Sequence, residues 1–238
     1  MAGRIADQTG QLRLALSAAR PFSRADFIVS PSNAAAVAAV DAWPDWLGGA
    51  LALVGPEGAG KTHLANAWAG QADAVVLSAA ATAALDTEAL GRRPVLLDDA
   101  EGATEEALFH LINRAAAGDG GLLLTGRLRP AGWTVRLPDL RSRLNALHVA
   151  ELGEADDALL TAVLQKFFRE RSITPVEDVL DYLVKRIGRS VRHARTVADA
   201  LDEAMDAAQR PLTRVLARSV LERLGGTADL FDGEDEAP

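Results

Sequence analysis

The chain has 238 residues, a formal net charge of −8 and no cysteine. This length can bury the core of one large domain or two small ones, and the lack of cysteine excludes disulfides, thiolate metal sites and a cysteine nucleophile. A protein that grips DNA by itself usually carries a basic face, so the acidic balance argues against DNA binding as the main activity. No apolar run reaches about 18 residues, and we therefore expect no transmembrane helix.

Residues 1–24 are predicted to form an arm ahead of the folded part of the chain. Residues 11–16 read QLRLAL, so that three leucines alternate with Arg13 and Ala15. In an extended peptide alternate residues share one face, and the leucines would then form an apolar edge for a partner. A first strand or helix packed on the protein's own domain is the alternative, and the arginines of the arm also leave an organellar transit peptide open.

Between residues 25 and 152, strand and helix patterns alternate. Four short apolar runs are predicted as buried strands, at 50–54, 74–78, 94–99 and 121–126. Helices are predicted at 60–69, 79–86 and 104–117, and another is predicted to end before Pro44. Buried strands that alternate with helices indicate an α/β fold, a parallel sheet with helices on both faces.

After about residue 152 the pattern is helical throughout. Helical periodicity predicts a separate lid over residues 153–224, made of four segments at 154–172, 175–188, 190–208 and 212–224. Residues 225–238 are rich in acidic side chains and are predicted to form a tail.

The sequence GPEGAGKT, from Gly55 to Thr62, fits the phosphate-binding pattern G-x-x-x-x-G-K-[ST]. It follows a predicted strand and opens a predicted helix, which is the context that supports the motif. Gly55, Gly58 and Gly60 let backbone N–H groups turn inward around phosphate oxygens, and the helix N-terminus adds the positive end of its dipole. Lys61 would reach the β- and γ-phosphates, and the Thr62 hydroxyl would ligate Mg²⁺.

Polar residues also end two other predicted strands. In VLLDDA, Asp98 would hold Mg²⁺ through water and Asp99 could orient the attacking water. Thr125, at the end of the next strand, could sense the γ-phosphate. An ordinary polar turn after one strand and an ordinary threonine at the end of the other are the alternatives.

Three arginines outside the strands are candidate phosphate ligands. Arg141 and Arg143 follow a proline-containing loop, and one of them could reach a neighbouring subunit's nucleotide. Arg192 begins a lid helix after Gly188 and could fold back onto the phosphates. The alternative in each case is a surface charge.

The ordered set of motifs resembles the AAA+ ATPases and looks most like their DnaA-related initiator clade. The motifs span residues 22–224 and read DFIVSPSN, GPEGAGKTHL, VLLDDA, LLLTG, LPDLRSRL and SVRHARTVADAL. The resemblance implies ADP or ATP with Mg²⁺ as the cofactor. It places Arg143 at the arginine-finger position, Arg192 at sensor 2 and Thr125 near sensor 1. It also implies that His63 belongs to the nucleotide site and that residues 28–33 frame the adenine.

DnaA itself continues past the lid into a helix-turn-helix DNA-binding domain, and only about 14 residues follow the predicted lid here. The resemblance therefore points to the Hda-type regulators, DnaA-related proteins that lack that domain and carry a clamp-binding peptide near the N-terminus. It implies that QLRLAL binds the sliding clamp, the β subunit of DNA polymerase III. Gln11 would enter a polar pocket of the clamp, and an apolar pocket would take Leu12, Leu14 and Leu16. Ala15 departs from the proline common in related motifs.

The resemblance implies regulatory inactivation of the initiator in the bacterial cytoplasm. Held by the DNA-loaded clamp, the protein would dock on ATP-bound DnaA, and Arg143 would stimulate hydrolysis in DnaA's site. Contact with DNA would be indirect, through the clamp, and no membrane would be involved. Nucleotide binding by this chain would then matter more than its own turnover.

Other functions remain open at this stage. One is a helicase-loader-type AAA+ ATPase that acts on single-stranded DNA, and another is a clamp adaptor whose nucleotide only stabilises the fold. A homo-oligomer is also open, although Asp139 stands where the initiator carries another arginine, which weakens any assembly into long filaments.

Overall fold

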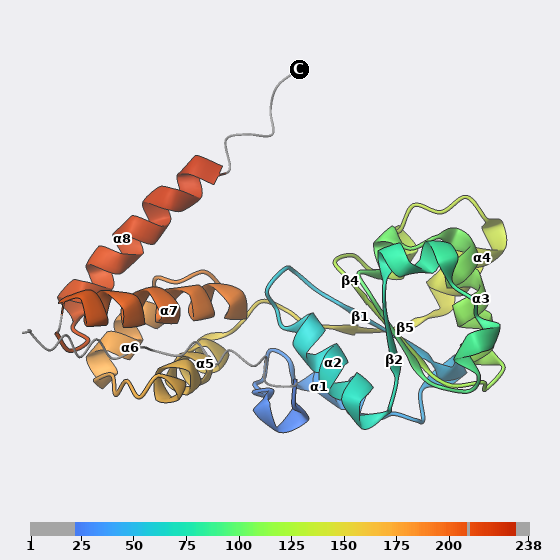
Figure 1. Cartoon of the computed structure of the whole chain (residues 1–238), viewed down its shortest axis with the longest axis horizontal. Coiled ribbons are helices and arrows are strands. Elements are labelled where there is room, and N and C mark those ends of the chain that lie inside the picture. Colours follow the sequence, from blue (N-terminus) through green and yellow to red (C-terminus); the bar gives the residue numbers. More distant parts are fainter. Residues whose placement is uncertain (1–21, 209, 232–238) are drawn as a thin grey trace, which may run out of the picture.

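A computed structural model gives the arrangement of residues 22–208 and 210–231 (Figure 1). The predicted clamp-binding residues of the arm lie outside the described residues: Gln11, Leu12, Leu14 and Leu16. Within the described ranges, none of the helices combines the length and the apolar character needed to cross a membrane.

A five-stranded sheet forms the centre of the larger unit. Its strands are ordered β2-β3-β4-β1-β5, and every neighbouring pair is parallel. The strands are β1 (Ala50–Val54), β2 (Val75–Ser78), β3 (Val95–Asp98), β4 (Leu122–Gly126) and β5 (His148–Glu151). The first four lie where the apolar runs predicted strands, whereas β5 was not predicted. This edge strand is exposed at both ends, and only its Ala150 is buried.

Helices cover both faces of the sheet (Figure 1). One face carries α1 (Ala34–Asp41) and α2 (Lys61–Gln71), and the other carries α3 (Glu105–Ala116) and α4 (Pro138–Ala146).

Strand β1 shows how its sequence produces this layering. Leu51 and Leu53 pack in the core beside α1 and α2. Their neighbours Ala50, Ala52 and Val54 pack in the core beside α3 and α4. Because both faces are covered, the strand is apolar at every position, and burying each leucine stabilises the fold by about 1.5–3 kcal/mol.

The connection between β2 and β3 differs from the helix predicted at 79–86. Two short 3-10 helices lie there, η3 (Ala79–Ala84) and η4 (Glu88–Leu90). The Thr82 hydroxyl donates to the Ala79 carbonyl at 2.6 Å and accepts from the Thr104 N–H at 3.0 Å. A side chain that bonds to nearby backbone in this way favours a tight turn over a continued α-helix. The other 3-10 helices are η1 (Arg24–Asp26), η2 (Leu47–Gly49), η5 (Ala100–Gly102) and η6 (Pro130–Gly132).

An all-helical lid follows the sheet and lies to its left in Figure 1. It comprises α5 (Asp157–Glu170), α6 (Glu177–Val184), α7 (Val191–Ala208) and α8 (Arg214–Phe231). The lid has its own core, in which Leu164, Phe168 and Leu201 are fully buried. The predicted fold class, a parallel α/β sheet flanked by helices with a C-terminal helical lid, is thereby confirmed.

Helix α8 is longer than the sequence suggested. It continues through residues 225–231, which we predicted to belong to the tail. These seven residues include two glycines but no proline. Glycine weakens a helix by about 1 kcal/mol, whereas proline would remove a hydrogen bond of the helix and break it.

Candidate functional site

The loop between β1 and α2 carries the phosphate-binding pattern. Gly58 and Gly60 have φ angles of 76° and 99°, a region that favours glycine. A Cβ on Gly58 would also collide with the hydroxyl oxygen of Ser190, just before the lid helix α7. Gly60 is the N-cap residue of α2, and no side chain caps this helix. The first N–H groups of α2 therefore remain available to an anion.

Lys61 opens α2, and its side chain turns back onto the loop. Its ammonium group donates to the carbonyl oxygens of Gly55 at 2.7 Å and Pro56 at 2.9 Å. The residue is 8% exposed, and this burial lowers the pKa of the ammonium group, while the charge of Asp99 acts in the opposite direction. A buried cation held by neutral carbonyl groups attracts a phosphate strongly. Thr62, the next residue, is exposed at the start of the same helix.

Three predicted site residues meet where β3 and β4 end. The Thr125 hydroxyl donates to Asp98 Oδ1 at 2.5 Å, and its oxygen accepts from the backbone N–H of Asp99 at 2.9 Å. Thr125 is buried, Asp98 is half-buried and Asp99 is exposed. Since the Asp99 charge also influences the pKa of Lys61, these acids and the phosphate loop belong to one site.

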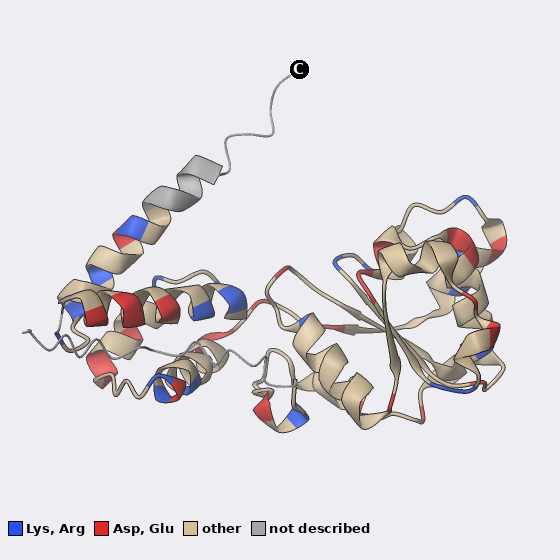
Figure 2. Ribbon diagram, viewed as in Figure 1, with Lys and Arg blue, Asp and Glu red and all other residues tan. Residues whose placement is uncertain are grey.

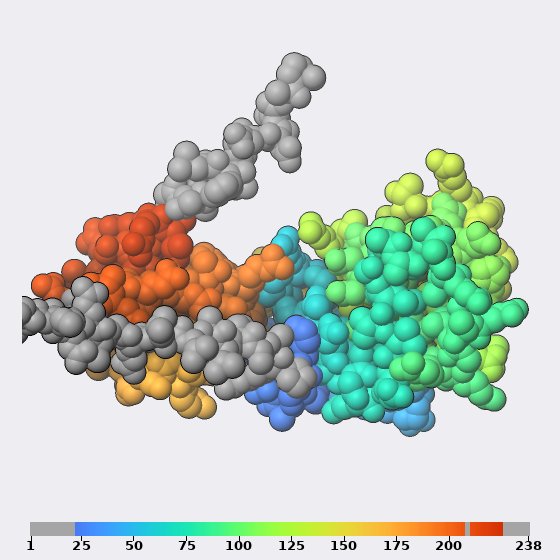
Figure 3. Space-filling model, in the orientation of Figure 1, coloured from blue at the N-terminus to red at the C-terminus, as the bar shows by residue number. Residues whose placement is uncertain are grey.

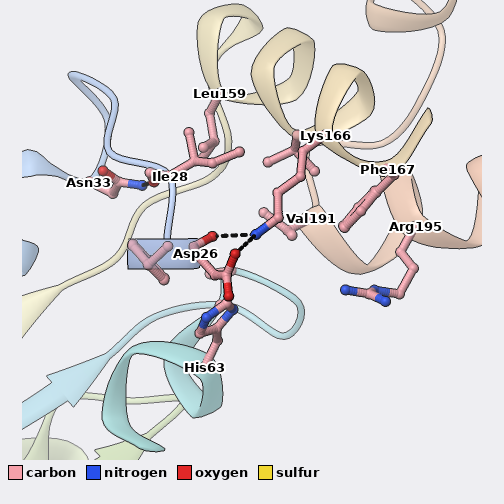
Figure 4. A pocket seen from close by; sticks show the side chains of 13 residues that line it. Asp26, Ile28, Asn33, His63, Leu159, Lys166, Phe167, Val191 and Arg195 are labelled. Atoms are coloured by element: carbon pink, nitrogen blue, oxygen red, sulfur yellow. Dashed lines mark hydrogen bonds and ion pairs between the residues drawn. The ribbon is translucent and has the colours of Figure 1, made fainter. Parts of the chain in front are cut away.

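A pocket opens beside this loop, between the start of α2, the segment before α1, and the lid (Figure 4). Apolar and aromatic side chains form most of its wall, among them Phe27, Ile28, Leu159, Val163 and Phe167. Asn33 shapes the wall, because its amide donates to the Ile28 carbonyl at 3.0 Å and accepts from the Ser30 N–H at 2.8 Å. Such a pocket with few polar groups suits a flat heteroaromatic ring.

His63 lines the same pocket. Its ring lies 5.3 Å from the ring of Phe22 and 5.4 Å from that of Phe27, measured between centroids. Its Nε2 is 3.2 Å from the Ser23 carbonyl oxygen, and burial lowers the pKa of the imidazole. The neutral ring therefore donates to this carbonyl and fixes the segment before α1 against α2.

The lid closes the other side of the pocket. Figure 4 shows Lys166 of α5 pointing at Asp26, and its Nζ is 3.0 Å from Asp26 Oδ1 and 2.7 Å from the Asp26 carbonyl oxygen. Arg195 of α7 lies over the Phe167 ring, 4.4 Å from its centroid. Asp156, just before α5, accepts from the Ser32 N–H at 3.1 Å. Polar contacts of Lys166 and Asp156 thus join the lid to the segment before α1.

Arg192 reaches the phosphate loop from the start of α7. Its Nη1 is 2.5 Å from Glu57 Oε1, and the neighbouring Val191 N–H donates to the Gly58 carbonyl at 3.1 Å. Figure 3 shows the surface notched at this place, between the lid (orange and red) and the sheet unit (green). The predicted lid arginine therefore stands beside the phosphate loop, with a carboxylate as its partner.

The structure separates the two arginines of α4. Arg141 donates to three backbone carbonyl groups, those of Trp133 at 2.8 Å, Val135 at 3.0 Å and Ala131 at 3.4 Å, and so ties down the preceding loop. Arg143 instead lies with its guanidinium 5.2 Å from the centroid of the Phe109 ring and 3.9 Å from Asp139. Within the described structure the buried Nε of Arg143 has no hydrogen-bond partner.

Arg143 does not join the other predicted site residues. It packs with α3 and α4 on one face of the sheet, whereas α2 and the core beside it lie on the other.

The residues at the loop fit a nucleotide with Mg²⁺. The described part of the chain holds no cluster of three or more His, Asp or Glu residues that could bind a metal by itself. Mg²⁺ usually takes one or two protein ligands and completes its shell with phosphates and water. Thr62 and Asp98 would supply those protein ligands, and Lys61 with the start of α2 would bind the phosphates.

Among the residues of this site that sequence reasoning missed, three form ion pairs: Glu57, Asp26 and Lys166. Glu57 occupies a variable position of the phosphate-binding pattern, so the motif carries no signal for it. Asp26 and Lys166 are separated by 140 residues, and nothing local in the sequence connects them.

Comparisons with known sequences identify a relative of this chain. No protein-family model matches the sequence. Over 182 residues the chain is 30% identical to an uncharacterized protein of Haemophilus influenzae, which corresponds to 70% of this chain and 79% of that protein.

Solved structures share the fold at low sequence identity. Domain III of the replication initiation protein DnaA from Thermotoga maritima superposes with a TM-score of 0.71 at 18% identity, over 85% of this chain and 96% of that one. The Thermotoga maritima RuvB branch migration motor gives 0.67 at 20% identity, over 86% and 72%. DnaA from Aquifex aeolicus with bound AMPPCP gives 0.63 at 20% identity, over 78% and 72%. The chain has the AAA+ ATPase fold.

Proposed function

We propose a function from two premises: the chain belongs to the same protein family as the uncharacterized Haemophilus influenzae protein, and it has the AAA+ fold of DnaA and RuvB. The function is that of a nucleotide-binding protein of DNA replication, and more specifically of an Hda-type negative regulator of initiation. Bound to the DNA-loaded sliding clamp, it stimulates ATP hydrolysis by DnaA in the bacterial cytoplasm.

The nucleotide part of this proposal rests on the phosphate loop and the pocket beside it. Lys61 and the uncapped start of α2 bind phosphate charge, and Thr62 with Asp98 holds Mg²⁺. The pocket around Phe27 and His63 receives the base. The AMPPCP-bound DnaA of Aquifex aeolicus, which shares the fold, supports an adenosine nucleotide, ADP or ATP, as the ligand.

The regulatory part rests on one observation, the different contacts that Arg141 and Arg143 make. Arg141 is committed to its own loop by three hydrogen bonds. Arg143 is partly exposed, lies across the sheet from α2, and keeps a buried donor without a partner. An arginine displayed away from its own phosphate loop suits the active site of another molecule.

Catalysis by such an arginine is electrostatic. A guanidinium aimed at a transferring phosphoryl group stabilises charge that develops only in the transition state. When supplied in trans, an arginine finger raises hydrolysis rates by about 10³–10⁵-fold. Arg143 would do this in the site of ATP-bound DnaA, and DnaA left with ADP could not start another round of initiation.

The arm supplies the link to the clamp in this proposal. Gln11 and the three leucines of QLRLAL bind the clamp surface, and a ring with several identical pockets adds avidity to a weak single contact. DNA is engaged only through the clamp, and no membrane takes part.

The decisive experiment follows labelled ATP on DnaA in single-turnover conditions, with DNA-loaded clamp, in the presence and absence of this protein. We expect hydrolysis to accelerate only when the clamp is on DNA and this protein carries nucleotide. Unchanged hydrolysis would reject the regulatory role. Strong ATP hydrolysis by this protein alone, stimulated by single-stranded DNA, would favour a helicase loader instead.

A further inference from the structure

The carboxylate of Glu57 connects the phosphate loop to two neighbouring segments, the start of α7 and the segment after β4. Its Oε1 is 2.5 Å from Nη1 of Arg192, which begins the lid helix α7. Its Oε2 is 3.3 Å from Nη2 of Arg127, which follows β4. Figure 2 shows the basic start of α7 facing the acidic tip of the loop between β1 and α2. One side chain of the loop thus holds a lid cation and a sheet cation at the same time.

A bound phosphate would compete with Glu57 for the guanidinium groups of Arg192 and Arg127. Lys61 and the uncapped start of α2 draw phosphate to the loop on which Glu57 sits. Backbone contact between Val191 and Gly58 keeps the start of α7 against that loop, so Arg192 is within reach of a phosphate chain bound there. Arginine binds phosphate in a strong, charge-assisted fork, whereas a carboxylate next to a phosphate is repelled.

We propose that Glu57 is a positioning residue that competes with the terminal phosphate of a nucleoside triphosphate for Arg192 and Arg127. Without that phosphate, Glu57 ties the lid to the loop. When the phosphate takes Arg192, the tie is broken and the position of the lid depends on the phosphate instead. This inference rests on the nucleotide site proposed above and goes beyond it, because it assigns to Glu57 a coupling between the nucleotide and the lid.

The size of the effect follows from exposure. The side chains of Glu57 and Arg192 are 53% and 69% exposed, and an exposed ion pair changes an equilibrium by roughly two- to fivefold. A triphosphate must break the pair, whereas a diphosphate that does not reach Arg192 leaves it intact. Removing the charge of Glu57 should therefore improve binding of the triphosphate relative to the diphosphate by about two- to fivefold.

The test measures the dissociation constants of ADP and of AMPPCP, by calorimetry, for the full chain and for Glu57→Gln. Glu151→Gln is the matched control, because Glu151 is also 53% exposed and pairs with a similarly exposed arginine, Arg129, at 2.6 Å. We expect the ratio of AMPPCP to ADP affinity to rise in Glu57→Gln and to stay unchanged in Glu151→Gln. The rise should shrink as salt is added, since salt screens the pair.

Two further measurements separate this inference from its premise. In Arg192→Ala, adding Glu57→Gln should change the affinity ratio less than it does in the wild type, because the shared partner is gone. In the nucleotide-free protein, the Val191 amide should exchange its hydrogen faster in Glu57→Gln, since the lid is held less firmly. If both nucleotides bind and the ratio does not move, the role of Glu57 is rejected and the nucleotide site stands. If neither nucleotide binds the wild type, both proposals fail.

Discussion

The Thr125 hydroxyl binds the Asp98 carboxylate at 2.5 Å and thereby joins the ends of two parallel strands. The same oxygen accepts the N–H of Asp99 at 2.9 Å, so that one buried side chain fixes both acids that follow β3. These hydrogen bonds make Thr125 a structural part of the site, in addition to any contact that it makes with a phosphate.

Thr125→Val should lower the free energy of unfolding by about 1–3 kcal/mol. Valine keeps the shape but cannot donate to Asp98 or accept from the Asp99 N–H, and an unpaired buried polar group carries a cost of this size. Urea unfolding measures the change. Thr125→Ser keeps the hydroxyl and is the control, and equal losses in the two variants would contradict a role for the hydrogen bonds.

Lys61→Ala should weaken ADP binding and remove the stabilisation that ADP gives. A ligand that binds only the folded state stabilises it by about 2.7 kcal/mol at a hundredfold excess over its dissociation constant. Thermal melts with and without ADP measure this. A shift as large in Lys61→Ala as in the wild type would show that the ammonium group does not hold the nucleotide.

Replacing Arg143 and replacing Arg141, both on α4, should impair different properties of the protein. Arg143→Ala should keep its fold and its ADP affinity but lose the stimulation of DnaA, because the guanidinium acts only on a transition state in the other molecule. Arg143→Lys should rescue poorly, since a point charge cannot replace the planar fork of donors. Single-turnover hydrolysis on DnaA is the measurement.

Arg141→Ala is the contrasting variant. It should destabilise the protein, because three carbonyl groups lose their donor. Full stimulation by Arg143→Ala would remove the trans-acting arginine from the mechanism, even if the chain proved to bind the clamp.

The contact that Asp156 makes between the lid and the sheet unit should lose its stabilising effect in acid. Its carboxylate accepts from the Leu159 N–H at 2.7 Å and from the Ser32 N–H at 3.1 Å. These bonds, that of Leu159 foremost, lower the pKa of Asp156. Because the folded pKa lies below the unfolded value of about 3.9, the stabilisation is fully present above pH 4 and is lost as pH falls through the folded pKa.

Asp156→Asn tests this contact. Asparagine also caps helices well, so the variant should retain most of its stability at pH 7 and show a flatter loss of stability below pH 4. Asp156→Ala should lose about 0.5–2 kcal/mol at neutral pH as well. Urea unfolding between pH 3 and 7 distinguishes them, and parallel curves for wild type and Asp156→Asn would exclude Asp156 as the titrating group.

Gln11→Ala combined with Leu14→Ala should abolish clamp binding and leave the melting temperature unchanged. The prediction rests on the position of both residues ahead of every described element of the fold. Binding to immobilised clamp and a thermal melt are the two measurements. A melting temperature lowered by several degrees would mean that the leucines belong to the core.

Helices and strands could be predicted from the sequence where a clear pattern of apolar residues lies within the element itself. Strand β1 is apolar at every position and follows directly from composition, whereas β5 has a single buried residue and too weak a pattern to notice. Helix α4 was also missed. It begins at Pro138 and is rich in polar residues, although proline at the first position is a common start of a helix.

The residues of the candidate site likewise fall into those that a local motif predicts and those that it does not. The phosphate loop is contiguous, so its glycines, Lys61 and Thr62 could be named in advance. The choice between Arg141 and Arg143 could not, because it depends on where three backbone carbonyl groups fall in space. The tie between Glu57 and Arg192 spans 135 residues and needed the packing of the lid.

The aromatic and ionic contacts that fix the segment before α1 also limit how far the QLRLAL peptide can extend from the folded part of the chain. His63 contacts the Ser23 carbonyl oxygen, and Arg24 pairs with Asp41 at 2.7 Å, so the chain is anchored here beside the pocket around Phe27 and His63. Six residues lead from Leu16 to Phe22, and even a fully extended chain of that length reaches only about 22 Å. If a partner binds QLRLAL as we propose, it is confined to a small sphere around the proposed nucleotide pocket, and lengthening residues 17–21 should lower the effective concentration of the bound partner there.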